Sequence, residues 1–478
     1  MLFCCMAAAL LLACSNDKSD GEGREPGVET ELNGTQLGEG TTLYGLVTDT
    51  SGNPVQGVVV SDGYNCVETD ANGVYQMIRY KKARFVWYST PAGYEINTSA
   101  DNYPLYYAEI VHKNIADRHD FVLKPLAAPE TDFTLLCIAD PQCASTADIS
   151  RYVNETIPDI EATVETFKAK GRAVYGITLG DIVFDTPDLW SNMKEAMGNR
   201  NLTIFQTIGN HDHEFPTANE KEARAKYESF FGPVDYSFNR GDVHIVSMDN
   251  IIHECQESAG YTGGFSAEQY EWLKQDLSYV PKDKMVILCV HIPFRNSKYA
   301  YYDEVLELLS QYKYATIMSA HTHSNINHIH TKNGKEIFEH VTGTSCGAWW
   351  RSTVCTEGTP IGFGIYRIEG AAMKEWNYKS VQHGEDFQIR LYRGSDKFTG
   401  GGDASYYFSK KNAGQIVANI WNWDPAWTVN VYENGAKTGT MTQYSDKDAW
   451  TVAYHIGILN NSSSYNTVSY THLRAHET

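Results

Sequence analysis

Apolar runs of strand length alternate with amphipathic stretches in the middle of the chain. The runs are Phe133–Ala139, Val174–Leu179, Leu202–Ile208, Val243–Met248, Met285–Val290 and Ala315–Met318, and the amphipathic stretches include Ile149–Lys168, Asn219–Phe230, Ser266–Leu277 and Tyr302–Gln311. Continuous apolar runs are typical of strands buried on both faces, whereas apolar positions recurring every three or four residues predict helices. We therefore predict an α/β domain over residues 130–370, with helices covering its sheets.

The segments on either side of this domain have a strand-only pattern. Residues 39–127 contain short alternating stretches with a turn signal about every ten residues, which predicts an N-terminal β-sandwich domain. This segment carries no chemical constellation, so we interpret it as a structural spacer. Residues 371–467 are again strand-like, with a hairpin predicted at Asn434-Gly435, and we expect an incomplete C-terminal β-rich domain there.

The N-terminus resembles the signal of a bacterial lipoprotein. The apolar run from Leu2 to Ala13 is too short to span a bilayer, and Cys14 and a polar, Gly-rich stretch follow it. The resemblance implies that residues 1–13 are a signal peptide, that Cys14 is lipidated and that residues 14–38 form a tether. We therefore expect a protein of the bacterial cell envelope, lipid-anchored and either periplasmic or surface-exposed.

The other end of the chain has no pattern that links it to the rest. Residues 468–478 resemble the conceptual translation of a sequencing adapter, and we expect them not to belong to the natural protein.

Composition narrows the range of partners. The 478 residues fit two to four domains, and 39 Lys and Arg against 59 Asp and Glu give a net charge of −20. A chain this acidic is a poor candidate for binding nucleic acid or an anionic membrane by charge. We therefore expect no nucleic-acid binding, and contact with a membrane through the lipid anchor alone.

Side chains that can bind metal ions directly follow five of the predicted central strands. They are Asp140 and Gln142 after the first strand, Asp181 after the second, Asn210, His211 and Asp212 after the third, His291 after the fifth, and His321 and His323 after the sixth. Sites in α/β sheets form at the carboxyl ends of strands, so we expect these side chains to meet at one edge. Residues two apart on an extended strand point the same way, which would bring His321 and His323 into the same site. Asp, Asn and His suit Mn, Fe or Zn, and this set is large enough for two ions that share a carboxylate.

The order of these motifs resembles the calcineurin-like metallophosphoesterases. The motifs are Asp140…Gln142, Gly180-Asp181, Gly209-Asn210-His211-Asp212, His291 and His321-Thr322-His323, and the resemblance covers about residues 131–370. It implies a two-sheet α-β-β-α sandwich that holds two divalent ions. Asp140 and His323 would hold the first ion, Asp181 would bridge the two ions, and Asn210, His291 and His321 would hold the second. The flanking β modules resemble those of a bacterial secreted subgroup.

The resemblance also implies an activity, the hydrolysis of a phosphate ester by attack of a metal-bound hydroxide. The bond could be a monoester, a diester or a pyrophosphate bond. His211 would act as the general acid, and Asp212 would orient its imidazole.

Two positions depart from the family pattern. Gln142 stands where the family usually has a histidine, so the first metal position is expected to be looser, and whether Gln142 is a ligand stays open. Phe184 stands where purple acid phosphatases place a metal-binding tyrosine, which argues against that branch. The alternative to an enzyme is a non-catalytic cell-surface binding protein built on a phosphoesterase shell.

Four further positions have both a functional and a structural interpretation. Asp185 either steadies the metal loop or is a solvated turn residue, and for His213 we favour a role as a polar loop residue over contact with a substrate. Trp349 and Trp350 either line a pocket or pack against their neighbours.

Overall fold

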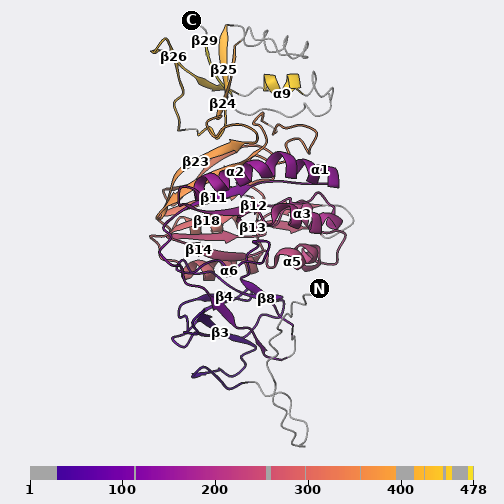
Figure 1. The fold of residues 1–478 in the computed structure, drawn as a ribbon, viewed down its shortest axis with the longest axis vertical. Coiled ribbons are helices and arrows are strands. Elements are labelled where there is room, and N and C mark those ends of the chain that lie inside the picture. The colour runs from indigo at the N-terminus through magenta and orange to yellow at the C-terminus, as the bar shows by residue number, and fades with distance from the viewer. Residues whose placement is uncertain are drawn as a thin grey trace, which may run out of the picture.

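Three parts of the protein follow one another along its long axis (Figure 1). The computed structural model describes residues 29–111, 115–254, 260–295, 298–355, 357–393, 414–424, 426–444, 448–454 and 472–476. The N-terminal strands form one end, the central sheets and helices the middle, and the C-terminal strands the other end. The predicted signal peptide, Cys14 and the first half of the predicted tether lie outside the described residues.

The central part contains two sheets, and all six predicted strands are present in them. The five-stranded sheet has the order β13 (Thr203–Thr207), β12 (Ala173–Leu179), β11 (Asp132–Ile138), β22 (Gly362–Glu369) and β23 (Ala372–Ser380). The six-stranded sheet has the order β14 (Tyr236–Arg240), β15 (Val243–Ser247), β18 (Met285–Cys289), β19 (Tyr314–Ser319), β21 (Lys335–Val341) and β20 (Ile326–Lys332). Within each sheet, the strands that carry the predicted motifs run parallel to one another, whereas β11 pairs with β22 in the antiparallel direction. Their carboxyl ends therefore lie at one edge of each sheet.

Helices cover the outer faces of both sheets, which confirms the predicted α-β-β-α layering (Figure 1). On the five-stranded sheet lie α1 (Thr146–Arg151), a π-helical turn (Tyr152–Thr156), α2 (Ile157–Lys168), α3 (Trp190–Met197) and α5 (Ala225–Phe231), and on the other sheet lie α6 (Ala267–Ser278) and α7 (Tyr302–Leu309). Helix α6 begins at a capping box, in which the Ser266 side chain accepts a hydrogen bond from the Gln269 backbone. Each helix presents one apolar face to its sheet.

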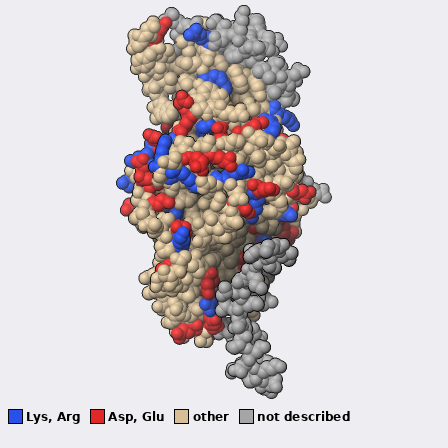
Figure 2. Space-filling view, in the orientation of Figure 1, with Lys and Arg blue, Asp and Glu red and all other residues tan. Residues whose placement is uncertain are grey.

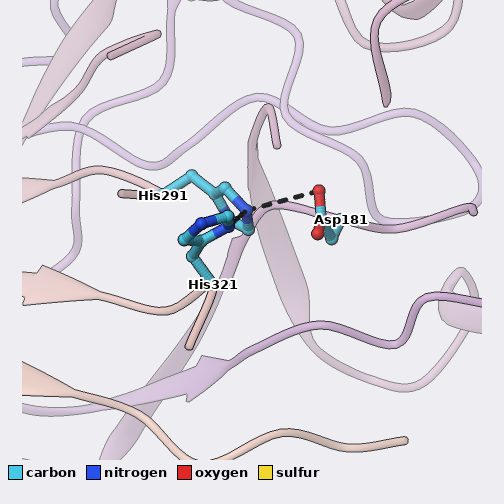
Figure 3. A group of neighbouring side chains, drawn as sticks. All are labelled: Asp181, His291 and His321. Atoms are coloured by element: carbon cyan, nitrogen blue, oxygen red, sulfur yellow. Dashed lines mark hydrogen bonds and ion pairs between the residues drawn. The ribbon is translucent and has the colours of Figure 1, made fainter. Parts of the chain in front are cut away.

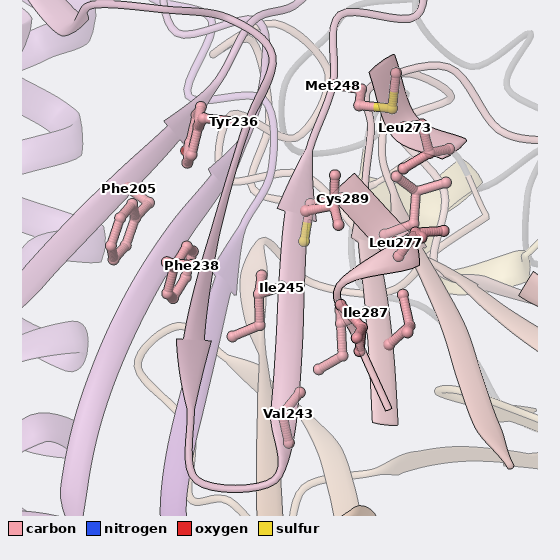
Figure 4. Close-up of a cluster of buried hydrophobic side chains, with 14 of the residues drawn as sticks. Phe205, Tyr236, Phe238, Val243, Ile245, Met248, Leu273, Leu277, Ile287 and Cys289 are labelled. Carbon is pink, nitrogen blue, oxygen red and sulfur yellow. The ribbon is translucent and has the colours of Figure 1, made fainter. Parts of the chain in front are cut away.

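The two sheets pack face to face through apolar side chains (Figure 4). Phe205 of β13 stacks on Phe238 of β14 with ring centroids 3.8 Å apart. Near the carboxyl ends of β13 and β15, the Thr207 and Ser247 hydroxyls form a hydrogen bond of 2.9 Å. This contact brings the carboxyl edges of the two sheets together, and the predicted site residues lie at that edge.

The N-terminal part consists of two four-stranded sheets, which agrees with the predicted β-sandwich. Its strands are β3 (Leu43–Asp49), β4 (Val59–Ser61), β5 (Cys66–Glu68), β6 (Val74–Met77), β7 (Phe85–Tyr88), β8 (Tyr107–Glu109), β9 (Asp117–Arg118) and β10 (Phe121–Leu123), and a short hairpin of β1 (Glu31–Leu32) and β2 (Thr35–Gln36) precedes them. The sandwich packs on α6, where the Trp87 and Trp272 rings meet at 5.8 Å and the Trp272 indole donates a hydrogen bond to the Ser61 hydroxyl. One continuous apolar cluster joins this part to the central domain.

The C-terminal part contains a four-stranded sheet of β24 (Ile389–Arg393), β25 (Gln415–Ile420), β29 (His472–His476) and β28 (Thr442–Tyr444). The predicted hairpin at Asn434-Gly435 joins β26 (Asn430–Glu433) to β27 (Ala436–Thr440), and α9 (Ala449–Ala453) follows. Strand β23 pairs with β22, so the central sheet extends to Ser380, beyond the expected boundary at residue 370. That residues 468–478 are foreign to the natural protein stays a prediction.

On the face shown in Figure 2, positive and negative side chains are interspersed over the central part. Within the described ranges, no helix is both long and apolar enough to cross a membrane.

Candidate metal centre

Five of the predicted site residues lie just beyond strand ends in the left-handed region of the backbone. Their φ angles are 43° for Asp140, 41° for Gln142, 50° for Asp181, 66° for His321 and 53° for His323. Non-glycine residues adopt this conformation rarely, and it concentrates at functional sites. The expectation that His321 and His323 share one face of an extended strand is wrong, because β19 ends at Ser319. The backbone curls after the strand, and this curl turns both side chains toward the site.

Asp181, His291 and His321 converge on one point (Figure 3). One ligand atom from each of them lies within 4.8 Å of the others. His321 Nδ1 is 3.1 Å from His291 Nε2, which is 3.3 Å from an Asp181 carboxylate oxygen. The amide oxygen of Asn210 lies 3.0 Å from the same His291 nitrogen. The four residues predicted for the second metal position, including the bridging Asp181, are therefore close together.

The electrostatics of this position favour a cation. Burial disfavours protonation of His291, but the charge of Asp181 outweighs it and raises the pKa of His291 to about 9. Burial is the main cause that lowers the pKa of His321 to about 3, and the charge of His291 is the second cause. Because the two facing nitrogens cannot both carry a proton, His321 remains neutral, which is the form that binds a metal ion.

The first predicted position contains an unsatisfied buried carboxylate. Asp140 is fully buried, and one of its oxygens has no hydrogen-bond partner among the described residues. His323 Nε2 is 3.6 Å from that oxygen, and the other ring nitrogen of His323 lies 3.2 Å from the Gly347 carbonyl. Burial raises the pKa of Asp140 well above its usual range. A buried carboxylate oxygen without a partner is costly, and a divalent ion held between Asp140, His323 and Asp181 would satisfy it.

The Gln142 side chain directs its amide nitrogen, and not its oxygen, toward Asp181. Its amide nitrogen donates a hydrogen bond of 3.1 Å to Asp181, whereas its oxygen faces the Cys346 thiol at 3.7 Å. An amide binds a metal ion through oxygen, so Gln142 would have to rotate its amide before it could serve as a ligand. That Gln142 is a metal ligand therefore stays a prediction.

His211 lies beside the metal positions without being part of them. Its backbone N–H donates to Asp181, and its Nδ1 is 2.9 Å from an Asp185 carboxylate oxygen. The ring packs on Phe184 with centroids 4.3 Å apart, which places Phe184 against a histidine rather than at a metal position. Burial disfavours the charged imidazole, but the hydrogen bond that the imidazole donates to Asp185 and the charge of Asp181 outweigh burial, so the pKa of His211 is raised.

The partner of His211 corrects one prediction. Asp185, and not Asp212, contacts the His211 imidazole. The carboxylate of Asp212 is buried and accepts hydrogen bonds from the backbone N–H groups of Ile182, Val183 and Gly209. Asp212 therefore joins the loop after β12 to the loop after β13. The two residues could not be told apart from sequence because both lie within a few residues of a predicted metal ligand.

Two residues that support the site follow a strand to which we assigned no site residue. The Val243–Met248 run ends in Asp249-Asn250, which is the same signal as at the other five strands. Asn250 accepts hydrogen bonds from the backbone of His291 and Ile292. Asp249 lies 3.2 Å from His213, a buried side chain whose other ring nitrogen is 2.9 Å from the Gly209 carbonyl. His213 therefore supports the loop that carries Asn210 and His211, in agreement with the favoured structural interpretation.

Asp249, His213 and Glu220 form a second group of potential metal ligands. Glu220 begins the short helix α4 (Glu220–Ala223). The Arg224 guanidinium lies 3.7 Å from Asp249 and thus already supplies a positive charge to this group.

Residues 344–354 form one wall of the first metal position. The Thr344 hydroxyl donates to the Asp140 carbonyl, and the Trp350 indole donates to the Pro141 carbonyl, both at 2.9 Å. Trp349 remains 47% exposed, with its ring 5.0 Å from that of His323. The buried Trp350 therefore anchors this segment to the loop after β11, whereas Trp349 lines the wall of the site.

Comparisons with known proteins agree with this arrangement. Residues 133–325 match the family described as calcineurin-like phosphoesterase, residues 41–126 match the N terminal of calcineurin-like phosphoesterase, and residues 339–475 match the C terminal of calcineurin-like phosphoesterase.

The chain is also similar to individual proteins over part of its length. It is 28% identical to purple acid phosphatase 15 of Arabidopsis thaliana over 155 residues, which are 29% of this chain and 27% of that protein. The structure of purple acid phosphatase PPD1 from yellow lupin (Lupinus luteus) seeds shares 14% identity at a TM-score of 0.34 and covers 56% of this chain and 52% of its own. The 5'-nucleotidase of Candida albicans shares 12% identity at a TM-score of 0.33, covering 53% and 52%. The chain thus spans about a quarter of the length of the curated relative and about half of each of these two structures.

Proposed function

Because the chain belongs to the calcineurin-like phosphoesterases, we propose that it is a metal-dependent hydrolase of phosphate esters. The observation that carries this proposal is the convergence of Asp181, His291 and His321 on one point. Asn210 approaches the same His291 nitrogen, and His323 approaches the unpartnered oxygen of the buried Asp140. Two divalent ions, with Mn, Fe or Zn as the candidates from the donor set, fit this arrangement.

Bound at these positions, two divalent ions would offset the charge of the phosphate and acidify a water molecule as the nucleophile. His211 is placed to supply the proton that the leaving oxygen needs. Its Nδ1 is engaged by Asp185, which leaves Nε2 for the substrate, and its side chain is 25% exposed beside the buried ligands. The raised pKa of His211 supports this role, because a general acid must hold its proton near the working pH.

The proposal is tested on the purified chain by elemental analysis and by hydrolysis assays. The protein is loaded separately with Mn, Fe and Zn, and p-nitrophenyl phosphate and bis(p-nitrophenyl) phosphate serve as probes. We expect close to two ions per chain and turnover of at least one probe. Asp181→Asn should reduce both metal content and turnover, whereas His211→Ala should reduce turnover and leave the metal content unchanged.

The alternative of a non-catalytic binding protein makes the opposite prediction from the same experiment. Full occupancy by metal without turnover of any phosphate ester would favour it. Turnover that is unaffected by both variants would show that this centre is not the active site.

We also propose that the protein is anchored through lipid at Cys14 in the bacterial cell envelope. The support for this proposal is the order of apolar run, cysteine and polar stretch in the sequence. Labelling with a fatty acid in a bacterial host tests it. Wild type should incorporate the label and fractionate with membranes, and Cys14→Ser should do neither.

A further inference from the structure

A cavity of about 220 Å³ lies beside His211. Its lining residues are Val183, Asp185, Thr186, Pro187, Trp190, His211, Asp212, His213, Glu214 and Phe215. None of the predicted metal ligands is among them. A cavity of about 150 Å³ can hold a benzene molecule, so this one has room for a somewhat larger group. Its position next to the proposed general acid makes it the place for the departing alcohol of a substrate.

The charged side chains around this cavity are carboxylates, apart from the imidazoles. Asp185, Asp212 and Glu214 line it, and no lysine or arginine does. The Asp212 carboxylate is engaged by three backbone N–H groups. The Asp185 carboxylate is already engaged by the His211 imidazole at 2.9 Å. Within the part of the chain that the structure describes, the carboxylate of Glu214 has no hydrogen bond or ion pair. A leaving group with a negative charge in this cavity would therefore be repelled by Glu214.

The remaining lining includes the apolar residues Val183 and Pro187 and two aromatic rings. Phe215 stacks on His253 at 5.2 Å, and Trp190 packs edge-on against Tyr227 at 5.7 Å, so both rings are held by their neighbours. The partly exposed Phe215 ring together with a carboxylate suits two kinds of alcohol. One is a compact cation such as an amino alcohol, and the other is an uncharged ring with hydroxyl groups.

Given the proposed function, on which this step rests, we propose that the cavity selects phosphate esters whose leaving alcohol is uncharged or cationic. It would discriminate against pyrophosphate bonds. In a pyrophosphate the leaving group is itself a phosphate, so its charge would lie against Glu214 and Asp185. The metal positions cannot make this distinction, because they bind the phosphoryl group that all these substrates share. The selection therefore comes from the residues around His211.

The test compares leaving groups of different charge on the full chain loaded with metal. The substrates are the phosphate monoesters of choline, glucose and glycerate, their methyl diesters, and inorganic pyrophosphate. The variant is Glu214→Gln, which removes one charge and keeps the shape. Glu195→Gln is the matched control, since Glu195 is exposed on α3, the helix that carries Trp190, and does not line the cavity.

Wild type should prefer the choline or glucose ester over the glycerate ester and pyrophosphate in kcat/KM. Glu214→Gln should raise kcat/KM for the glycerate ester and pyrophosphate about three- to tenfold and lower it for the choline ester by a similar factor. The glucose ester should change less than twofold, and Glu195→Gln should leave the whole pattern unaltered. The ratio of choline to glucose ester in wild type identifies which of the two alcohols the cavity favours.

Pyrophosphate hydrolysis as efficient as that of the neutral ester would overturn the inference, as would a Glu214→Gln variant that changes all leaving groups equally. Neither result would contradict the proposed function. The absence of turnover with every substrate would instead overturn the proposed function, and this inference with it.

Discussion

Replacing Gln142 with histidine should raise the affinity of the first metal position by at least about 10- to 100-fold. The reason is the hydrogen bond of 3.1 Å from the Gln142 amide to Asp181, which occupies the carboxylate that a bridged pair of ions would use. A hydrogen bond to a charged group contributes about 1.5–3 kcal/mol, and breaking it must be offset whenever an ion binds. That range corresponds to about one to two orders of magnitude in affinity.

The backbone at this position accepts the substitution. Gln142 has a φ of 41°, and histidine is among the residues that tolerate the left-handed region. Histidine also brings a neutral ring nitrogen, which is a better ligand for Mn, Fe or Zn than an amide. The gain in metal affinity should therefore come from two sources, the removal of the hydrogen bond that competes for Asp181 and the new nitrogen ligand.

Titration calorimetry with Mn or Zn on metal-free protein measures the effect, with the two binding steps fitted separately. Gln142→Met is the dissecting control, because it removes the amide and adds no nitrogen ligand. We expect Gln142→His to tighten the weaker step and Gln142→Met to tighten it less. If Gln142→Met bound the weaker ion less tightly than wild type, Gln142 would itself be a ligand after rotation of its amide, and the reasoning would be refuted.

Three further predictions concern the surroundings of the site. Asp185→Asn removes a partner that raises the pKa of His211, so the loss of activity on the alkaline side of the pH profile should move to lower pH; an unmoved profile would exclude His211 as the general acid. Trp272→Ala should lower the free energy of unfolding by about 3–5 kcal/mol, measured by urea titration, because the indole is fully buried between α6 and the N-terminal strands. Removing metal with a chelator should abolish activity and lower the Tm, because Asp140 without an ion keeps an unpaired buried oxygen. Adding the metal back should restore both, and a Tm that is insensitive to the chelator would contradict a metal ion at that carboxylate.

The strands of the central domain were predictable because they are buried on both faces. Six continuous apolar runs correspond to β11, β12, β13, β15, β18 and β19, and the polar residues that follow them mark the carboxyl edge. Burial of whole strands is what makes this signal strong. Strand β23 gives no such signal because it is an edge strand with exposed and half-buried positions, so its pairing with the central sheet was not predicted.

The residues that could bind a metal ion were predictable from the sequence, and the residues that support them were less so. Metal-binding residue types at five strand ends can be counted in a sequence, but a hydrogen bond such as that between Asp185 and His211 depends on how a loop folds back. The same holds for Asp212, whose carboxylate serves three backbone groups. Asp249 could have been found, since it follows a predicted strand in the same way as the ligands do.

The left-handed turns at the strand ends limit which amino acids these positions can accept. Asp140, Asp181, His321 and His323 hold a conformation that costs on the order of 1 kcal/mol or more for most side chains and is least unfavourable for Asn, Asp, His and glycine. Three of these four residue types are also metal ligands. During evolution, a mutation that keeps the backbone at these positions will therefore often keep a ligand as well, so the centre can exchange one metal-binding side chain for another more readily than it can lose the capacity to bind.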